Sequence, residues 1–144
     1  MEVEFKVADF GSPEQLESIE LRRRILRWPL GLDLTAEDIA KEQNEFHLVA
    51  LQEGRLLACL VLTPLDRQSI KMRQVAVEPD LQGRGIGTRL VAFSEDVARQ
   101  KGFSRMVLHA RDTAVPFYLR LNYAIEGEPF EEVTIPHRRM MKML

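Results

Sequence analysis

The chain has little of what several classes of protein require. It has one cysteine, Cys59, in 144 residues, so it forms no internal disulfide and has no thiol pair for zinc or redox chemistry. Its formal net charge is −2, without the positive excess by which proteins bind nucleic-acid phosphates. No apolar run approaches the roughly 20 residues that cross a bilayer. We therefore expect no nucleic-acid partner, no membrane partner and no metal.

What remains is the composition of an ordinary globular domain, with 45% hydrophobic and 29% charged residues. The length suits one domain with one buried core, and we expect it to cover residues 1–144. The first ten residues, MEVEFKVADF, alternate and carry charge, which is not the pattern of a signal peptide or an anchor. A reducing, cytoplasmic location is expected. Cys59 stands in the apolar run LLACLVL, which favours packing in the core over nucleophilic chemistry.

Hydrophobic periodicity predicts a mixed α/β fold. Ser12, Pro13 and Gln15 are typical of a helix start, and the helix should end at residues 28–31 (WPLG). Its apolar side should be Leu16, Ile19 and Leu26, with Arg22, Arg23, Arg24 and Arg27 facing solvent near acidic partners. Further helices are expected from residue 35, over 87–101 and over 113–121. Strands are expected at 3–7, 46–51, 55–64, 69–77, 105–110, 123–130 and 133–144.

A glycine-rich loop lies between the strand at 69–77 and the helix that follows it. It does not contain the Gly-x-x-x-x-Gly-Lys-Ser/Thr string of a P-loop. The dinucleotide string G-x-G-x-x-G is also missing, because the sixth place is Thr88 counted from Gly83 and Leu90 counted from Gly85. A Rossmann loop should moreover follow the first strand of a repeated βαβ unit. The loop belongs to neither class.

The spacing that is present is Gln82-x-x-Gly85-x-Gly87. Backbone N–H groups without side chains in the way form a concave site for an anion. The first turn of the following helix adds unpaired donors and the positive end of its dipole. Arg84 and Arg89 supply positive charge nearby. The loop is therefore predicted to bind a pyrophosphate.

The stretch V-A-V-x-P-x-x-Q-G-R-G-I-G-T-x-L begins at Val75, and A-x-x-F-Y-x-x-L-x-Y covers Ala114–Tyr123. Together they resemble the GNAT superfamily of acyl-CoA-dependent N-acetyltransferases. The resemblance implies a central, twisted, mostly antiparallel sheet that splays at its middle strands and is flanked by helices. It also implies an enzyme that transfers an acetyl group from acetyl-CoA to a primary amine of a small molecule or peptide.

The resemblance carries roles onto particular residues. The freed edge of the strand at Val75, Ala76 and Val77 would pair with the pantetheine arm, and the Val77 N–H would polarise the thioester carbonyl. The expected cofactor-binding residues are Val75, Ala76, Val77, Gln82, Gly83, Arg84, Gly85, Ile86, Gly87 and Thr88. Arg111 stands where many members have asparagine, so that contact with pantetheine is not carried over. Asn122 replaces a glycine and tolerates the same left-handed backbone.

Tyr118 is the expected general acid, since the family pattern places its hydroxyl beside the sulfur of coenzyme A. Packing behind Phe117 is the alternative. The base is left open among Glu45, His47, Glu78, His137 and water. His109 is expected to pack in the core. The acidic run EGEPFEE, with Glu126, Glu128, Glu131 and Glu132, is either a solvated loop or a means of attracting a cationic amine.

Two other functions compete with the enzyme. A non-catalytic acyl-CoA-binding regulatory module would use the same loop, but the retained Tyr118 favours catalysis. A dinucleotide-binding domain is disfavoured by Thr88 and by the order of the strands. The amine acceptor is not specified by any of these residues. GNAT proteins often dimerise, so a homodimer is an open alternative without a predicted interface.

Overall fold

The computed structural model describes residues 2–144, which form two compact units. The first unit comprises the chain up to Thr63 together with Gln74–Ser94. The second comprises Pro64–Arg73 and Glu95–Leu144. Strand β4 (Ser69–Val77) and helix α3 (Ile86–Gln100) each contribute residues to both units.

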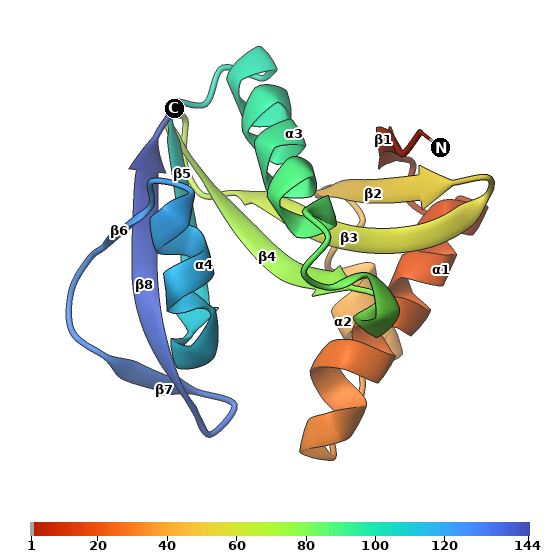
Figure 1. The fold of residues 1–144 in the computed structure, drawn as a ribbon, viewed down its shortest axis with the longest axis horizontal. Helices are drawn as coiled ribbons and strands as arrows, with labels where there is room; N and C mark the ends of the chain where they lie inside the picture. The colour runs from red at the N-terminus through yellow and green to blue at the C-terminus, as the bar shows by residue number, and fades with distance from the viewer. Residues whose placement is uncertain (1) are drawn as a thin grey trace. The chain divides into compact units, whose positions relative to one another are not determined.

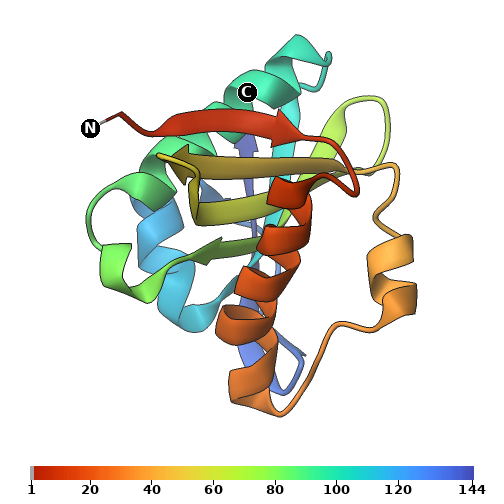
Figure 2. The same ribbon diagram turned by 90° about the vertical axis from the view of Figure 1, so that its right-hand side faces the viewer.

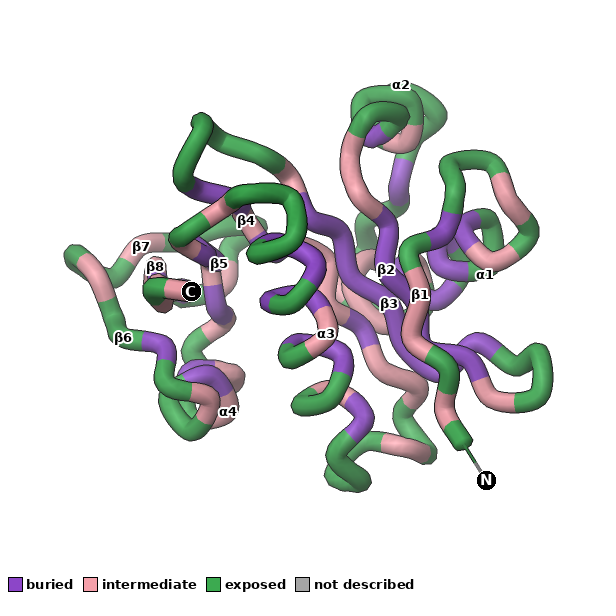
Figure 3. The backbone as a smooth tube through the Cα atoms, turned by 90° about the horizontal axis from the view of Figure 1, so that it is seen from above, coloured by how far each residue is buried: buried purple, intermediate pink, exposed green. Residues whose placement is uncertain are grey.

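The first unit is built on three consecutive antiparallel strands. They are β1 (Glu4–Ala8), β2 (Phe46–Gln52) and β3 (Arg55–Pro64), with β4 beside β3 (Figure 1). The β2–β3 turn has positive φ at Glu53 (50°) and Gly54 (81°), as in a hairpin turn whose twist matches that of its strands. Strands β2 and β3 are buried along most of their length (Figure 3). The predicted hairpin is confirmed.

Helix α1 (Pro13–Arg22) starts as the sequence predicts and lies against β2; Figure 2 shows it crossing the strands of this unit. The Ser12 hydroxyl accepts a hydrogen bond from the Gln15 N–H (3.3 Å), and the Gln15 side chain accepts one from the Gly11 N–H (3.0 Å). Beyond Arg22 the chain continues as a π-helical turn, η1 (Arg23–Arg27), and a 3-10 turn, η2 (Trp28–Leu30). Gly31, at φ 73°, ends the run at the predicted place.

The buried face of α1 differs from the predicted one. Ile19 is buried, but Leu16 is 56% exposed, and Leu21 is fully buried in its place. Arg22 was expected in solvent and is 1% exposed, because it pairs with the Glu42 carboxylate. A core cluster of this unit consists of Ala8, Leu21, Val49, Leu51, Leu56, Cys59 and Ala76. Burial raises the pKa of Cys59 to about 12, which confirms packing as its role.

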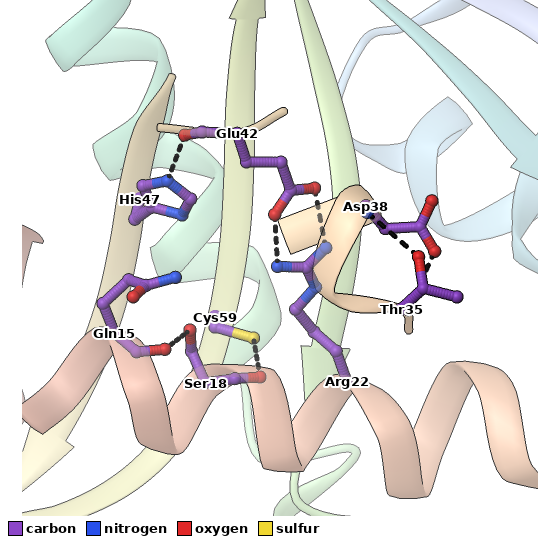
Figure 4. A network of polar contacts seen from close by, with 8 residues as sticks. All are labelled: Gln15, Ser18, Arg22, Thr35, Asp38, Glu42, His47 and Cys59. Atoms are coloured by element: carbon purple, nitrogen blue, oxygen red, sulfur yellow. Dashed lines mark hydrogen bonds and ion pairs between the residues drawn. The ribbon is translucent and has the colours of Figure 1, made fainter. Parts of the chain in front are cut away.

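The short helix α2 (Ala36–Ala40) also forms where it was expected. The Thr35 hydroxyl accepts a hydrogen bond from the Asp38 N–H (3.1 Å), and the Asp38 carboxylate accepts one from the Thr35 N–H (3.0 Å). This reciprocal cap satisfies two donors that the helix start leaves unpaired. The helix leads to Glu42, which belongs to the buried polar network of Figure 4.

The second unit is built around β8 (Ile135–Met143), which pairs antiparallel with β5 (Arg105–Arg111), β6 (Ala124–Ile125) and β7 (Phe130–Glu132). The residues predicted as one strand at 123–130 form two short ones. Gly127 (φ 81°) interrupts them, and the Glu126 side chain turns to arginines. Helix α4 (Val115–Arg120) follows the 3-10 turn η4 (Asp112–Ala114). The 3-10 turn η3 (Pro79–Leu81) belongs to the first unit. Asn122, at φ 71°, has the predicted left-handed backbone.

The beginning of β4 pairs parallel with β5. Its register runs from Ser69↔Arg105 to Met72↔Leu108 and stops there, although β5 continues to Arg111. Gln74, just beyond, has φ 57°, which an L residue adopts inside a strand only where the strand is distorted. The mixed, mostly antiparallel fold is confirmed, and the pairing of β4 with β5 ends before Gln74.

The β7–β8 turn is strained. Its two residues, Val133 (φ 47°) and Thr134 (φ 63°), have a left-handed backbone that β-branched side chains resist. Val133→Asn should therefore raise the free energy of unfolding by about 1 kcal/mol, measured by denaturant titration. Val7→Asn, at an exposed valine of β1, is the control and should not stabilise the protein. An unchanged or lower stability of Val133→Asn would contradict the prediction.

Candidate functional site

The glycine loop follows β4 in the first unit. The chain leaves the strand at Glu78, makes the turn η3 and passes through an exposed segment, Gln82–Gly85, before α3 begins at Ile86. Gly83 (φ 81°) and Gly85 (φ 83°) have the left-handed backbone that other residues resist. Beyond their chain neighbours, no atom lies within 4 Å of a Cβ built on either glycine. The loop thus presents bare backbone to solvent.

The start of α3 supplies the donors. Its first helical hydrogen bond runs from the Arg89 N–H to the Gly85 carbonyl (3.0 Å), so the N–H groups of Ile86, Gly87 and Thr88 lie before it. These groups and the positive end of the helix dipole favour an anion. The Gln82 amide donates to the Val77 carbonyl (3.2 Å), which ties the loop to the end of β4.

The two arginines of the loop region have different surroundings. Arg84 is exposed within the loop. The Arg89 guanidinium instead lies over the Phe5 ring, 4.9 Å from its centroid, and this contact holds α3 to β1. Arg89 thus has an aromatic packing partner, whereas Arg84 is exposed within the loop itself.

The end of β4 carries the other expected cofactor residues. Ala76 is buried in the core cluster of the first unit, while Val75 and Val77 are half-buried. All three follow Gln74, at which the backbone is distorted. Of these three residues only Ala76, with its small side chain, is fully buried in the core of the first unit.

Tyr118 lies on α4 in the second unit and is 7% exposed. Its ring packs edge-on against Phe117 (4.9 Å between centroids) and Tyr123 (5.7 Å). Burial raises the pKa of the Tyr118 phenol, so the hydroxyl stays protonated at neutral pH. A buried, protonated phenol can donate a proton and also packs as an aromatic.

Two of the base candidates in the first unit are already engaged. His47 is 2% exposed, and its Nε2 lies 2.9 Å from the Glu42 carbonyl (Figure 4). Glu78 accepts a hydrogen bond of 2.6 Å from the Arg24 guanidinium, which raises the pKa of that arginine. Glu45 is half-buried just before β2.

A polar cluster in the second unit was not predicted. His109 was expected in the core, but its Nδ1 lies 3.1 Å from Oε1 of Glu132 and 3.3 Å from Nζ of Lys71. His137 is buried; its Nδ1 lies 2.7 Å from the Ile135 carbonyl oxygen and its Nε2 3.7 Å from Oε2 of Glu132. We call Lys71, His109, Glu132 and His137 the histidine cluster. Two polar residues inside predicted strands, Lys71 and His109, were the signal in the sequence.

An aromatic ring separates the two histidines. Phe130 meets the His109 ring edge-on (4.9 Å) and stacks on His137 (5.9 Å). The strained turn after Glu132 fixes the β7–β8 register, with Phe130 opposite His137 and Glu132 opposite Ile135. The acidic run is thus partly engaged: Glu132 belongs to the cluster, and Glu126 accepts from Arg105 (3.0 Å) and Arg139 (2.8 Å).

Two features are absent from residues 2–144. No three or more His, Cys, Asp or Glu side chains gather closely enough there to hold a metal ion. No helix in this range combines the length and apolar character needed to cross a membrane.

Comparison with known proteins places the chain in a family. A family described as "Acetyltransferase (GNAT) family" matches residues 13–123. Protein YyaT of Bacillus subtilis is 31% identical over 72 residues, which is 50% of this chain and 49% of YyaT. The chain spans about half or less of the length of the curated relatives it matches.

Solved structures share the fold across nearly the whole chain. An acyl-CoA N-acyltransferase from Pseudomonas aeruginosa has a TM-score of 0.80 at 20% identity, covering 98% of this chain and 99% of that one. A GNAT family acetyltransferase from Elizabethkingia anophelis, solved with acetyl-CoA bound, has a TM-score of 0.74 at 18% identity, covering 99% and 98%. The chain therefore belongs to the GNAT family of acetyltransferases.

Proposed function

We propose that this chain transfers an acetyl group from acetyl-CoA to a primary amine of a small molecule or peptide, with residues 1–144 acting as one N-acetyltransferase domain. The observation that carries the proposal is the bare-backbone loop Gln82–Gly85 at the start of α3, in a chain of the GNAT family. A family member of the same fold has been solved with acetyl-CoA bound, which supports the choice of acyl donor.

The proposed binding mode uses backbone more than side chains. The N–H groups of the Gly85–Thr88 segment would hold the pyrophosphate, and Arg84 would add charge. The backbone of Val75, Ala76 and Val77 would pair with the amides of the pantetheine arm as an added strand does. The Val77 N–H would polarise the thioester carbonyl as the negative charge develops on its oxygen.

The reaction needs a neutral amine and a protonated leaving group. Alkylamines have a pKa near 10.4 and thiols one near 8.5, so at neutral pH the amine must lose a proton and the departing thiolate must gain one. Tyr118 is the proposed donor to the thiolate, since its phenol is buried and protonated. Attack forms the C–N bond, and collapse of the tetrahedral intermediate breaks the C–S bond.

The loop is tested by adding side chains to it. Gly87→Val and Gly85→Val should each weaken acetyl-CoA binding by about thirtyfold or more, because a branched side chain blocks approach to the N–H groups. Calorimetric titration measures this directly. Gly87 is the cleaner site, because it lies inside α3 and is not among the glycines with positive φ.

Gly54→Val is the matched control for Gly85→Val. Both glycines have a positive φ (81° and 83°) and open space around them, so both variants suffer the same backbone strain. Gly54 lies in the β2–β3 turn, and its variant should bind acetyl-CoA like the wild type. Unchanged affinity of folded Gly87→Val would refute the binding mode. Wild-type protein that binds acetyl-CoA but acetylates no member of an amine panel would refute the enzymatic function.

A further inference from the structure

The histidine cluster lies at the end of the parallel β4–β5 ladder in the second unit. The β4–β5 ladder ends at Met72↔Leu108, and His109 is the next residue of β5. Ligands of α/β proteins bind beyond the carboxyl ends of parallel strands, where neighbouring strands diverge. The His109 side chain is 24% exposed, so its ring is packed but still reached by solvent.

Both polar contacts of the His109 ring are made by one nitrogen, Nδ1. A carboxylate oxygen 3.1 Å away, as in Glu132, is attracted to an Nδ1–H and repelled by an unprotonated Nδ1. The Lys71 ammonium, 3.3 Å from the same nitrogen, can only donate and would need the opposite tautomer, so a neutral ring makes one of these two hydrogen bonds and not both. The closer contact, with Glu132, requires the hydrogen on Nδ1. The Nε2 atom then has a free lone pair and can accept a proton. A carboxylate that fixes a histidine tautomer in this way is what orients the base of a serine hydrolase.

We infer that His109 is the general base of the proposed acetyl transfer, accepting the proton of the amine on Nε2, and that Glu132 is the positioning residue that holds its tautomer. This inference rests on the proposed function and deepens it. The acceptor amine would bind beside Nε2 of His109.

The charges around His109 suit a base. Burial lowers its pKa, as do the charges of Lys71 on β4 and Arg139 on β8, while the Glu132 carboxylate raises it. The net pKa lies below the ordinary value of 6.5, so the ring is neutral at neutral pH. The charge of Arg73 on β4 also acts on Lys71, and the charge of His137 on β8 acts on Glu132.

Glu132 itself stays ionised. Burial raises the pKa of its carboxyl, but the hydrogen bond and charge of His109 and the charges of His137 and Lys71 lower it further, below its usual range. A carboxylate that is charged throughout the neutral range can hold the His109 Nδ1–H over that whole range.

Acetyl transfer removes two protons from the substrate nitrogen. The substrate ammonium gives one proton to Nε2 of His109, which passes it to water, and the neutral amine attacks the thioester carbonyl. The nitrogen loses a second proton to solvent as the C–N bond forms, and the thiolate takes one from Tyr118 as the C–S bond breaks. Tyr118 then recovers a proton from solvent. One proton is released to solvent for each acetyl group transferred.

Kinetics of three variants test the inference. His109→Gln should lower kcat/KM for the amine by about 100-fold or more and leave acetyl-CoA affinity unchanged. In the wild type kcat/KM should fall as the pH drops through the His109 pKa, below 6.5, because a base must be unprotonated. Glu132→Gln should lower kcat and shift the fall of kcat/KM to lower pH, because the carboxylate that raises the pKa of His109 is gone.

Glu131→Gln is the matched control. It removes the same charge from the adjacent residue of β7, whose side chain points to the opposite side of the strand. In this variant kcat/KM should therefore fall at the same acidic pH as in the wild type. Tautomers are read by NMR of the histidine ring nitrogens, where neutral His109 should show Nδ1–H in the wild type. An Nε2–H tautomer, or a His109→Gln variant with wild-type kcat/KM, overturns the inference and leaves the acetyltransferase standing. A wild-type protein inactive on all amines overturns the proposed function instead.

Discussion

Replacing Tyr118 by phenylalanine should lower kcat by about 10²–10⁴-fold and leave acetyl-CoA affinity near that of the wild type. The substitution keeps the ring and its edge-on contacts with Phe117 and Tyr123, and it removes the one proposed proton donor to the thiolate. A group that acts only in the transition state lowers kcat and kcat/KM together, so steady-state kinetics with calorimetry distinguish this effect from lost binding.

The leaving group provides an independent check. An acetyl thioester whose thiol has a lower pKa needs protonation less, so the defect of Tyr118→Phe should shrink with it. Tyr123→Phe is the matched control. Tyr123 is the other tyrosine of the chain, and its hydroxyl donates to the Glu95 carboxylate (2.8 Å), which itself pairs with Lys142 (3.1 Å). That variant should lose stability and keep kcat. Full kcat in Tyr118→Phe would reduce Tyr118 to a packing residue.

Breaking the buried ion pair of the first unit should cost about 3–5 kcal/mol of the free energy of unfolding. The two guanidinium NH groups of Arg22 each donate to one carboxylate oxygen of Glu42 at 2.8 Å, and the side chains are 1% and 6% exposed. Glu42→Leu leaves the guanidinium buried without its counter-charge. That loss is a large share of the roughly 5–15 kcal/mol by which domains are stable, and denaturant titration measures it.

The double variant Arg22→Met/Glu42→Leu shows whether the loss of stability comes from an unpaired buried charge or from the loss of the two side chains. Apolar side chains of similar volume need no counter-charge, so the double variant should be much more stable than either single variant and close to the wild type. An ion pair at the surface serves as the control for burial. Lys41→Met, which breaks a pair between side chains that are 70% and 80% exposed, should change stability little. Additive losses in the double variant would contradict this account.

Features that depend on neighbouring residues were predictable from the sequence. The Ser12 and Thr35 caps, the β2–β3 hairpin, the bounds of β4 and the left-handed Asn122 each follow from short-range geometry. The glycine loop belongs with them, because the strand, the glycines and the helix start are consecutive. Pyrophosphate binding by this loop was inferred from the same consecutive residues, and it stays a prediction.

Features that depend on distant partners could not be predicted in this way. Arg22 looked like part of a solvated arginine face because Glu42, its partner, lies twenty residues away along the chain. His109 looked like a core residue because Lys71 and Glu132 reach it from two other strands. The contact of Arg89 with Phe5 was not predicted either, because Phe5 lies on β1, far away along the chain. In each case tertiary pairing decided the contacts of a charged group.

The order of the strands along the chain has a consequence for synthesis on the ribosome. Every residue of the first unit has been translated once Ser94 has been added, whereas β8, the strand that joins β5, β6 and β7, is translated after all three of them. Protein domains generally begin to fold from the end that emerges first. A nascent chain halted before Ile135 would keep the residues of the glycine loop and the buried ion pair and would lack β8, the antiparallel partner of β5. Premature termination would therefore leave a strand edge at His109 exposed to other chains.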